Sequence, residues 1–349
     1  MSIKKGFSFE TDELKQAEAD EIAQEFLNDW KIFHSFRLPR DNELNILLHQ
    51  SYADVFRRDK APEFNGLPYF SPSSAGSCSR ELHEKVKGSP KDRETTVSHH
   101  QTMWQNIGTA IGDTVQYQIL LMERHFTKVT GQELRFKFQK NALQEPLFEE
   151  FSRTLKRIHH NGEDFYLYGV TDGIMLYKNS QEEVLRVGLE VKSKQTTYAS
   201  TGYRNMKSAN PKHVQQCVTY SMMYGVDYWV IVYVNGSKKA WEMSEEELEK
   251  YPYIRAFGIY VTDSMKKAVL DKFASVLKGV RENNPPLPSL VDWTFNNFKE
   301  SIAKSLTEEE FLMVIEQAEQ IEFSNLPAFK KKAAQQAIEF IAQRRGLDV

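Results

Sequence analysis

Between residues 133 and 236 the chain changes from helical to strand-like patterning, and this change most constrains its fold. Three segments have the residue alternation expected of strands: 133–140, 165–177 and 184–194. A fourth segment, 228–236, is almost continuously apolar, as a strand in the middle of a sheet is. A helix is expected at about 211–224, between the third and fourth strands. The order of helix, three strands, helix and strand predicts an α/β fold and not a solenoid.

Helical periodicity dominates the remainder of the chain. Helices are expected at 12–33, at 42–57 with Asp41 as N-cap, and at 103–126, where the pattern predicts a long, mostly buried helix. After the proline-rich segment 282–290 more helices follow, one of them opened by a capping box of Thr307 and Glu310. We therefore expect three parts: an N-terminal helical extension (1–65), a core (66–292) and a C-terminal helical extension (293–349).

Composition narrows the class of protein. The 349 residues carry 45 Lys and Arg against 48 Asp and Glu, and 12% of them are aromatic, which is typical of a globular chain. No apolar run approaches the ~20 residues of a membrane span, and the first thirty residues do not resemble a signal peptide. Cys78 and Cys217 are far apart and form no CxxC pair, which argues against a zinc ribbon and a disulfide framework. These features predict a cytoplasmic protein that does not bind membranes.

The strongest chemical signal lies on the second and third expected strands. Asp172 stands between Gly169 and Gly173, and Glu190 and Lys192 follow at alternate positions of one strand, so their side chains share a face. If the two strands form a hairpin, the two carboxylates converge into a site suited to Mg²⁺ or Mn²⁺. A lysine there can position or deprotonate the attacking water and offset charge on a phosphate. The alternative is a surface strand with an ordinary ion pair.

A basic strip follows this set. From residue 191 to 226 there are five basic residues and no Asp or Glu, and two tyrosines lie among the bases, as a nucleic-acid track requires. The candidates for DNA contact are Lys194, Tyr198, Tyr203, Arg204, Lys207 and Lys212. In the next helix Gln216 and Tyr220 are four residues apart, so they share a face directed toward the site. The alternative for the strip is a solvated loop that happens to lack acids.

Five motifs together resemble the RecB-like branch of the PD-(D/E)XK nuclease superfamily, which includes CRISPR-associated and phage recombination exonucleases. They are SPSSAGSCSR (71–80), GTAIGD (108–113), GVTDG (169–173), LEVKSK (189–194) and Gln216-x-x-x-Tyr220. The resemblance implies a restriction-endonuclease-like core, a central mixed sheet flanked by helices. It also implies Asp172 and Glu190 as metal ligands with the Val191 carbonyl, and Lys192, Gln216 and Tyr220 as further catalytic residues.

Two departures from the family pattern affect the expected site. Many relatives have a metal-binding histidine where this chain has Gly112, so we expect Asp113 in the metal site, with Gln116 as the other candidate. Relatives with an iron–sulfur cluster use one cysteine near Cys78 and three after the proline-rich segment, where this chain has none. No iron–sulfur cluster is therefore expected, and Arg80 is expected to contact phosphate or to be structural.

The expected function is that of a Mg²⁺- or Mn²⁺-dependent deoxyribonuclease. The resemblance favours an exonuclease acting on DNA ends or single strands in recombination, repair or phage DNA processing, in a bacterial or phage-infected cytoplasm. The helical extensions are the expected contacts for a recombination or replication protein. Two alternatives stay open, a non-catalytic DNA-binding or assembly protein on the same fold and a structure-specific endonuclease.

Overall fold

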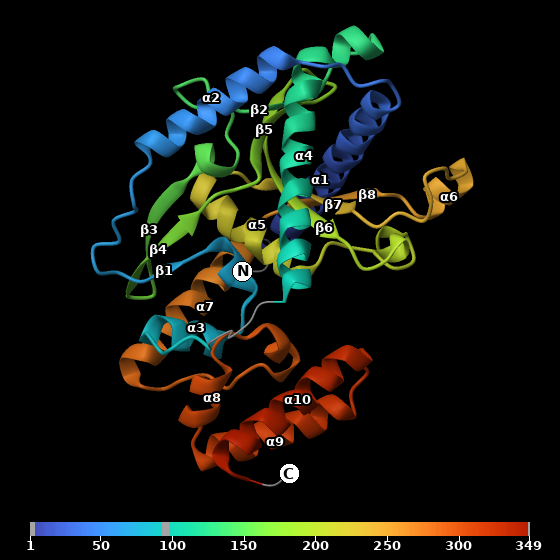
Figure 1. Ribbon diagram of the computed structural model, residues 1–349. Coiled ribbons are helices and arrows are strands. Elements are labelled where there is room, and N and C mark those ends of the chain that lie inside the picture. The colour runs from blue at the N-terminus through green and yellow to red at the C-terminus, as the bar shows by residue number, and fades with distance from the viewer. Residues whose placement is uncertain (1–3, 93–97, 348–349) are drawn as a thin grey trace.

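The main sheet has five strands in the order β2-β5-β6-β7-β8 (Figure 1). The computed structural model describes residues 4–92 and 98–347. The strands are β2 (Phe136–Phe138), β5 (Gly173–Lys178), β6 (Val184–Lys194), β7 (Tyr228–Asn235) and β8 (Ile254–Tyr260). Strands β5 and β6 are antiparallel and β6 and β7 are parallel, joined by the crossover helix α5 (Pro211–Tyr224). The sheet is therefore mixed.

A second sheet of three strands lies beside the first, in the order β1-β4-β3. Its strands are β1 (Tyr69–Phe70), β3 (Thr154–His160) and β4 (Glu163–Gly169). The single strand expected at 165–177 is wrong in this respect: its first half is β4 in the small sheet and its second half is β5 in the main sheet. The chain passes from one sheet to the other at residues 170–172, and Asp172 lies at that passage.

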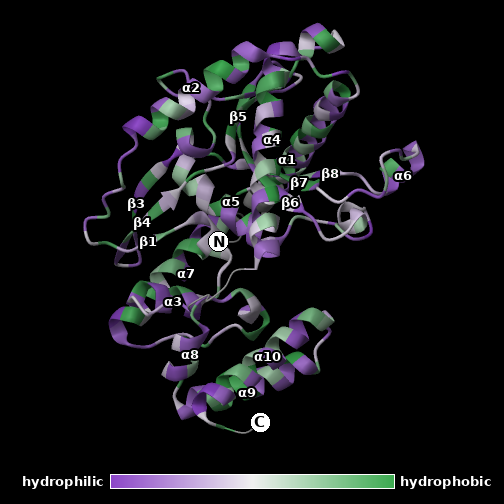
Figure 2. Ribbon diagram, in the orientation of Figure 1, coloured by the Kyte–Doolittle hydropathy of each residue, from purple (hydrophilic) through white to green (hydrophobic). Residues whose placement is uncertain are grey.

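Three helices cover one face of the main sheet: α1 (Lys4–His34), α2 (Asn42–Arg58) and α4 (His99–Thr130). Helix α2 begins where its sequence predicts, because the Asp41 carboxylate accepts a hydrogen bond from Leu44 N at 2.8 Å. Phe26 of α1 and Phe126 of α4 are buried with Val230 and Val232 of β7 in the core between these helices and the sheet. Hydrophobic residues concentrate in the middle of the main sheet and in the helices packed on it (Figure 2).

Helix α4 is longer and less buried than expected. Its second half packs on the sheet through Val115, Ile119 and Phe126, but residues 99–107 are exposed throughout, including Trp104. The sequence pattern gives no sign of this difference because both halves carry apolar residues at helical spacing. The first half lies beside the end of β6 instead, where Gln195 Nε2 donates to the Trp104 carbonyl at 3.1 Å.

The opposite face is covered by α5, by α7 (Asp263–Glu282) and by the small sheet. Trp229, Ile231 and Tyr233 of β7 point to this side, whereas Val230 and Val232 point to the other. Because paired residues of parallel strands share a face, Glu190 and Lys192 also point toward α5. The short helix α3 (Ser79–Lys87) and the 3₁₀ helix η1 (Pro72–Gly76) pack on α7 and α5 in this region. The other short elements are α6 (Glu245–Lys250), η3 (Tyr198–Thr201) and η2 (Glu149–Ser152), of which η2 packs in the core beneath α2.

The C-terminal helices form a group with a small hydrophobic core of its own (Figure 1). The group consists of η4 (Leu290–Phe295), α8 (Lys299–Ser305), α9 (Glu308–Glu322) and α10 (Ala328–Arg345). Thr307 and Glu310 make the expected capping box at the start of α9. None of the helices in 4–92 and 98–347 is long and apolar enough to cross a membrane.

The expected fold class is confirmed: the chain is an α/β protein with a central mixed sheet flanked by helices. The division at residues 65 and 292 stays a prediction. Helix α1, assigned to the N-terminal extension, contributes Ile22, Phe26 and Trp30 to the same core as the main sheet, so it packs as part of that layer.

Candidate active site

Asp172, where the chain passes from one sheet to the other, is held by hydrogen bonds to its side-chain carboxylate and to its main-chain carbonyl. Its Oδ2 accepts from Val191 N of the neighbouring strand at 2.6 Å, and its carbonyl accepts from Gln116 Nε2 of α4 at 3.0 Å. The two flanking glycines are required by close packing. A Cβ on Gly169 would lie 2.8 Å from Pro72, and one on Gly173 would overlap the Phe138 ring. Close packing and hydrogen bonds therefore fix the backbone at residues 169–173 and the position of the Asp172 carboxylate.

Glu190 and Lys192 of β6 complete the expected set. Because β5 and β6 are antiparallel, with Gly173 opposite Leu189, Asp172 and Glu190 come together as the sequence predicts. Glu190 is only 1% exposed, and its Oε2 has no hydrogen-bond partner in the described structure. Oε1 forms an ion pair with Lys192 Nζ.

The electrostatics of the two carboxylates follow from this burial. Burial and the neighbouring Asp172 charge raise the pKa of Glu190 to about 8, against the opposing effect of Lys192. Burial also raises the pKa of Asp172, although the hydrogen bond from Val191 N favours its ionised form. Two buried carboxylates that resist ionisation together are stabilised by a cation between them.

Helix α5 holds the lysine in place. Lys192 Nζ donates to Gln216 Oε1 at 3.1 Å, and Gln216 Nε2 donates to the Tyr220 hydroxyl at 3.1 Å. Tyr220 is buried, and its ring stacks on Trp229 of β7 at a centroid distance of 5.5 Å. The expected glutamine–tyrosine pair thus lies against the acid–lysine set and orients its ammonium group.

A third carboxylate, Glu149, lies near the site and was not expected from the sequence. Its main-chain N donates to the Thr171 carbonyl at 2.7 Å, and its Oε2 accepts from the Tyr52 hydroxyl at 2.9 Å. Burial, followed by the charges of Asp113 and Asp172, raises the pKa of Glu149. Its φ of 42° is rare for a non-glycine residue and is typical of positions held by their surroundings. No sequence signal marks Glu149, since it begins the short 3₁₀ helix η2 and its partners Tyr52 and Thr171 are distant in the chain.

The donor set fits a hard divalent cation. Asp172, Glu190 and the Val191 carbonyl would hold the ion, and the unpartnered Oε2 of the buried Glu190 is available as a ligand. In the described part of the chain, no three His, Cys, Asp or Glu side chains are gathered as a ready-made ligand group. Asp113 is exposed on α4, on the side of Glu149, so water is expected to complete the coordination.

The expected DNA-binding residues divide into two groups. Lys194 lies next to the site, with Nζ 5.3 Å from the centre of the Tyr233 ring. The others lie along the segment that leads to α5 or at the start of that helix: Tyr198, Tyr203, Arg204, Lys207 and Lys212. Tyr203 is 57% exposed beneath the Arg255 guanidinium, and Lys212 forms an ion pair with Asp292 at 2.6 Å.

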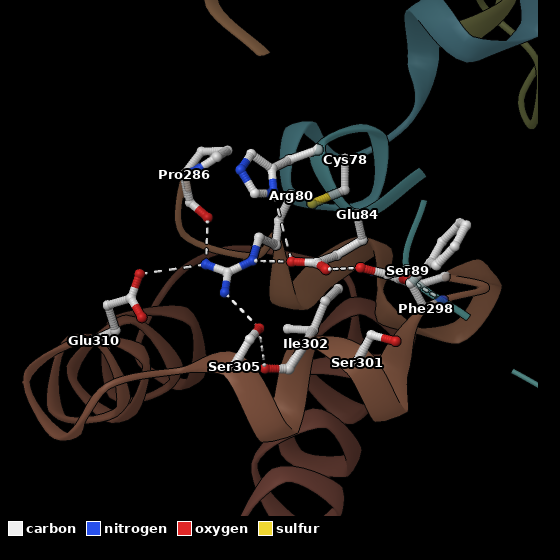
Figure 3. Close-up of polar contacts among 12 residues, drawn as sticks. Cys78, Arg80, Glu84, Ser89, Pro286, Phe298, Ser301, Ile302, Ser305 and Glu310 are labelled. Atoms are coloured by element: carbon white, nitrogen blue, oxygen red, sulfur yellow. Dashed lines mark hydrogen bonds and ion pairs between the residues drawn. The ribbon is translucent and has the colours of Figure 1, made fainter. Parts of the chain in front are cut away.

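Arg80 does not belong with these residues. Its side chain is fully buried between α3 and the C-terminal helices, where it pairs with Glu84 at 3.1 Å and Glu310 at 3.3 Å (Figure 3). It also donates to the Pro286 carbonyl at 3.0 Å and to Ser305 Oγ at 2.8 Å. Of the two roles expected for Arg80 the structural one is right, and its place among the DNA contacts is wrong because no DNA phosphate reaches a buried guanidinium.

Comparison with known proteins finds no matching family model and no matching curated protein. Among solved structures the chain is similar to "SSO0001", with 10% identity and a TM-score of 0.37 over 76% of this chain and 98% of that one. It is also similar to an alkaline exonuclease, LHK-Exo from Laribacter hongkongensis, with 11% identity and a TM-score of 0.36 over 62% of this chain and 90% of that one. The same enzyme in complex with dAMP gives 9% identity and a TM-score of 0.30 over 63% and 90%.

Proposed function

We propose that this protein is a metal-dependent deoxyribonuclease whose active centre is Asp172, Glu190 and Lys192. One observation carries the proposal: Glu190 is buried beside a second buried carboxylate, with Lys192 as the sole partner of its Oε1 and no partner for its Oε2 among the described residues. Burying such a pair is unfavourable for folding, so it is expected only where a ligand compensates for it.

The residues of the active centre have different roles in the proposed reaction. A Mg²⁺ or Mn²⁺ ion held by Asp172, Glu190 and the Val191 carbonyl would supply Lewis-acid chemistry. The Lys192 ammonium offsets negative charge that develops on the phosphate during hydrolysis, and Gln216 keeps it in position. Glu149 and Asp113 add negative charge on the α4 side, where they are suited to orient water.

DNA is the substrate that the surroundings favour. Lys194, Arg204 and Lys207 have no ion-pair partner among the described residues, and no acidic residue lies between 191 and 226. Tyr203 is exposed beside them and presents a ring on which an unpaired base can stack. These features support an exonuclease acting on ends or single strands.

The test is cleavage of end-labelled linear DNA and closed circular DNA, with and without Mn²⁺. We expect Mn²⁺-dependent loss of label from the linear substrate only. Asp172→Ala, Glu190→Ala and Lys192→Ala should each lower the rate by at least about a thousandfold while DNA binding is kept. Asp164→Ala, a partly exposed acid of β4, is the matched control and should cleave like wild type.

Each other outcome has a defined meaning. Wild-type activity in any of the three site variants contradicts the assignment of that residue. Cleavage of the closed circle shows an endonuclease, and DNA binding without cleavage under any divalent cation shows a non-catalytic binding protein.

A further inference from the structure

One row of side chains on β6 faces a second row on α5 at the active site. In the second row, His213 has no role in the proposed function. On β6 the first row is Glu190, Lys192 and Lys194, at alternate positions of one strand face. On α5 the second row is Tyr220, Gln216 and His213, about one helical turn apart. Gln216 contacts Lys192, so His213 comes next along the helix, toward Lys194.

The hydrogen bonds around Tyr233 favour one tautomer of His213. Asn210 N donates to the Tyr233 hydroxyl oxygen at 2.9 Å, and His213 Nδ1 lies 2.8 Å from the same oxygen. Because the Asn210 amide can only donate, the hydroxyl hydrogen is free to point at Nδ1, which then accepts. We assign the hydrogen to Nε2, for which no partner is found among the described residues.

The charges around His213 are all positive. Burial, followed by Lys192 and Lys194, lowers its pKa to about 4, so the ring is neutral at physiological pH. Lys194 lies on the Tyr233 ring that also anchors His213, and burial without a facing carboxylate lowers the pKa of this lysine. A neutral N–H donor and a partly desolvated ammonium group thus share one small region without a counter-charge.

We infer that His213 and Lys194 form a phosphate subsite that binds the DNA backbone phosphate next to the one being cleaved. Residues two apart on a strand are separated by about 6.6 Å, which is close to the spacing of successive phosphates along an extended DNA strand. If Lys192 contacts the reacting phosphate, Lys194 lies at the right spacing to contact the next phosphate of the same DNA strand. This inference rests on the proposed function, because it takes the Lys192 position as the reacting one.

The subsite has a testable signature because its two members differ in charge. Binding of a six-nucleotide single strand is measured by fluorescence anisotropy across a salt series, with Ca²⁺ as a hard cation in place of Mg²⁺. Lys194→Gln should weaken binding and reduce the slope of log K against log salt by about 0.7. His213→Ala should weaken binding about tenfold with the slope unchanged, because a neutral donor releases no counterion.

Two further variants separate a phosphate contact from a structural role. His213→Gln keeps an N–H donor and should recover most of the affinity, and His159→Ala, an exposed histidine of β3, should bind like wild type. All variants should melt within a few degrees of wild type. If His213→Ala melts far lower, His213→Gln and the modified oligonucleotides below provide the test.

Oligonucleotides with one neutral methylphosphonate linkage locate the contact. Wild type should lose affinity when one neighbour of the scissile phosphate, on its 5′ or its 3′ side, is neutral. His213→Ala should lose clearly less affinity at that same position, because only Lys194 still contacts that phosphate. Equal sensitivity of both proteins at every position, or wild-type binding by His213→Ala, would overturn the subsite. If the binding pattern holds but no DNA is cleaved, the nuclease proposal fails and the phosphate subsite stands.

Discussion

At the scale of single residues, the active centre lowers the stability of the folded protein, because it buries a carboxylate in the main sheet. Glu190 ends the buried stretch of β6 that begins at Val187, and the residue before it, Leu189, is fully buried and apolar. A carboxylate there loses its hydration and receives only the Lys192 ammonium in return. A bound cation would replace the lost hydration of the carboxylate and so stabilise the folded state.

The pH dependence of stability follows from Glu190. Its pKa is 4.5 in an unfolded chain and about 8 in the folded protein, so between these values the folded state holds the proton more tightly. In EDTA, the free energy of unfolding should therefore fall as the pH rises from about 5 to 8. Glu190→Gln should flatten this dependence and be more stable than wild type at pH 8 by on the order of 1–3 kcal/mol.

Urea denaturation at a series of pH values measures this effect. Adding Mn²⁺ at pH 8 should raise the melting temperature of wild type and leave that of Glu190→Gln nearly unchanged. The same slope in both proteins, or an equal response to Mn²⁺, contradicts a coupled acid–metal site at this position.

At the scale of elements, backbone contact decides how α1 joins the sheet. Gln16 of α1 donates from Nε2 to the Gly258 carbonyl at 2.9 Å, and its Oε1 accepts from Tyr260 N at 3.0 Å. The helix thereby satisfies the outer edge of β8, which would otherwise be open to further strands. This approach is so close that a Cβ on Gly258 would overlap the main chain of Ala19.

Gly258→Ala should therefore displace α1 from β8 and destabilise the protein by about 1–3 kcal/mol or more. The matched control is Gly112→Ala in α4, where nothing lies within 4 Å of the added Cβ and the helix gains about 0.5–1 kcal/mol. Chemical denaturation of both variants checks the pair, and equal stability of Gly258→Ala and wild type contradicts this docking.

The basic strip is an element-scale feature of the segment between β6 and α5. Arg204 and Lys207 are exposed, whereas Lys212 is already paired with Asp292. Replacing all three by Gln should weaken binding to every DNA sequence alike and reduce the salt slope by about two. Exposed lysines of three helices, Lys31, Lys128 and Lys278, serve as the control set when changed to Gln. An unchanged slope in the first variant removes the strip from the DNA path.

At the scale of the whole molecule, the C-terminal helices are tied to the rest by buried charge. Arg80 of α3 reaches Glu310 of α9, Ser305 of α8 and the Pro286 carbonyl from one fully buried guanidinium (Figure 3). The C-terminal group has its own small core, so this network is a principal link between two hydrophobic units. A bidentate, planar group suits such a junction better than a lysine.

Arg80→Ala should destabilise the protein by about 3–5 kcal/mol, because Glu84 would be left buried without its partner. Limited proteolysis should then cut first within residues 286–310. Arg344→Ala, which removes an exposed ion pair with Glu300, should cost about 0–1 kcal/mol. Equal protease resistance of Arg80→Ala and wild type contradicts the linking role.

The features that the sequence determined by itself are those with local causes. Helix α5 begins after Asn210, whose side chain caps Lys212 N, and ends at Gly225 in the left-handed conformation, so both limits are encoded within a few residues. Strand β7 follows from its apolar run, and the acid–acid–lysine set follows from strand periodicity once β5 and β6 pair.

The features that only the tertiary structure decided depend on partners distant in the chain. The segment 165–177 divides between two sheets at Gly169 and Gly173, where Pro72 and Phe138 pack closely, and the glycines alone do not show that the two halves join different sheets. Glu149 joins the site through Tyr52 and Thr171, and Arg80 is buried by helices some 200 residues later. The residue type sets which interactions a side chain can make. Packing by elements distant in the sequence decides which of these interactions it makes in the folded protein.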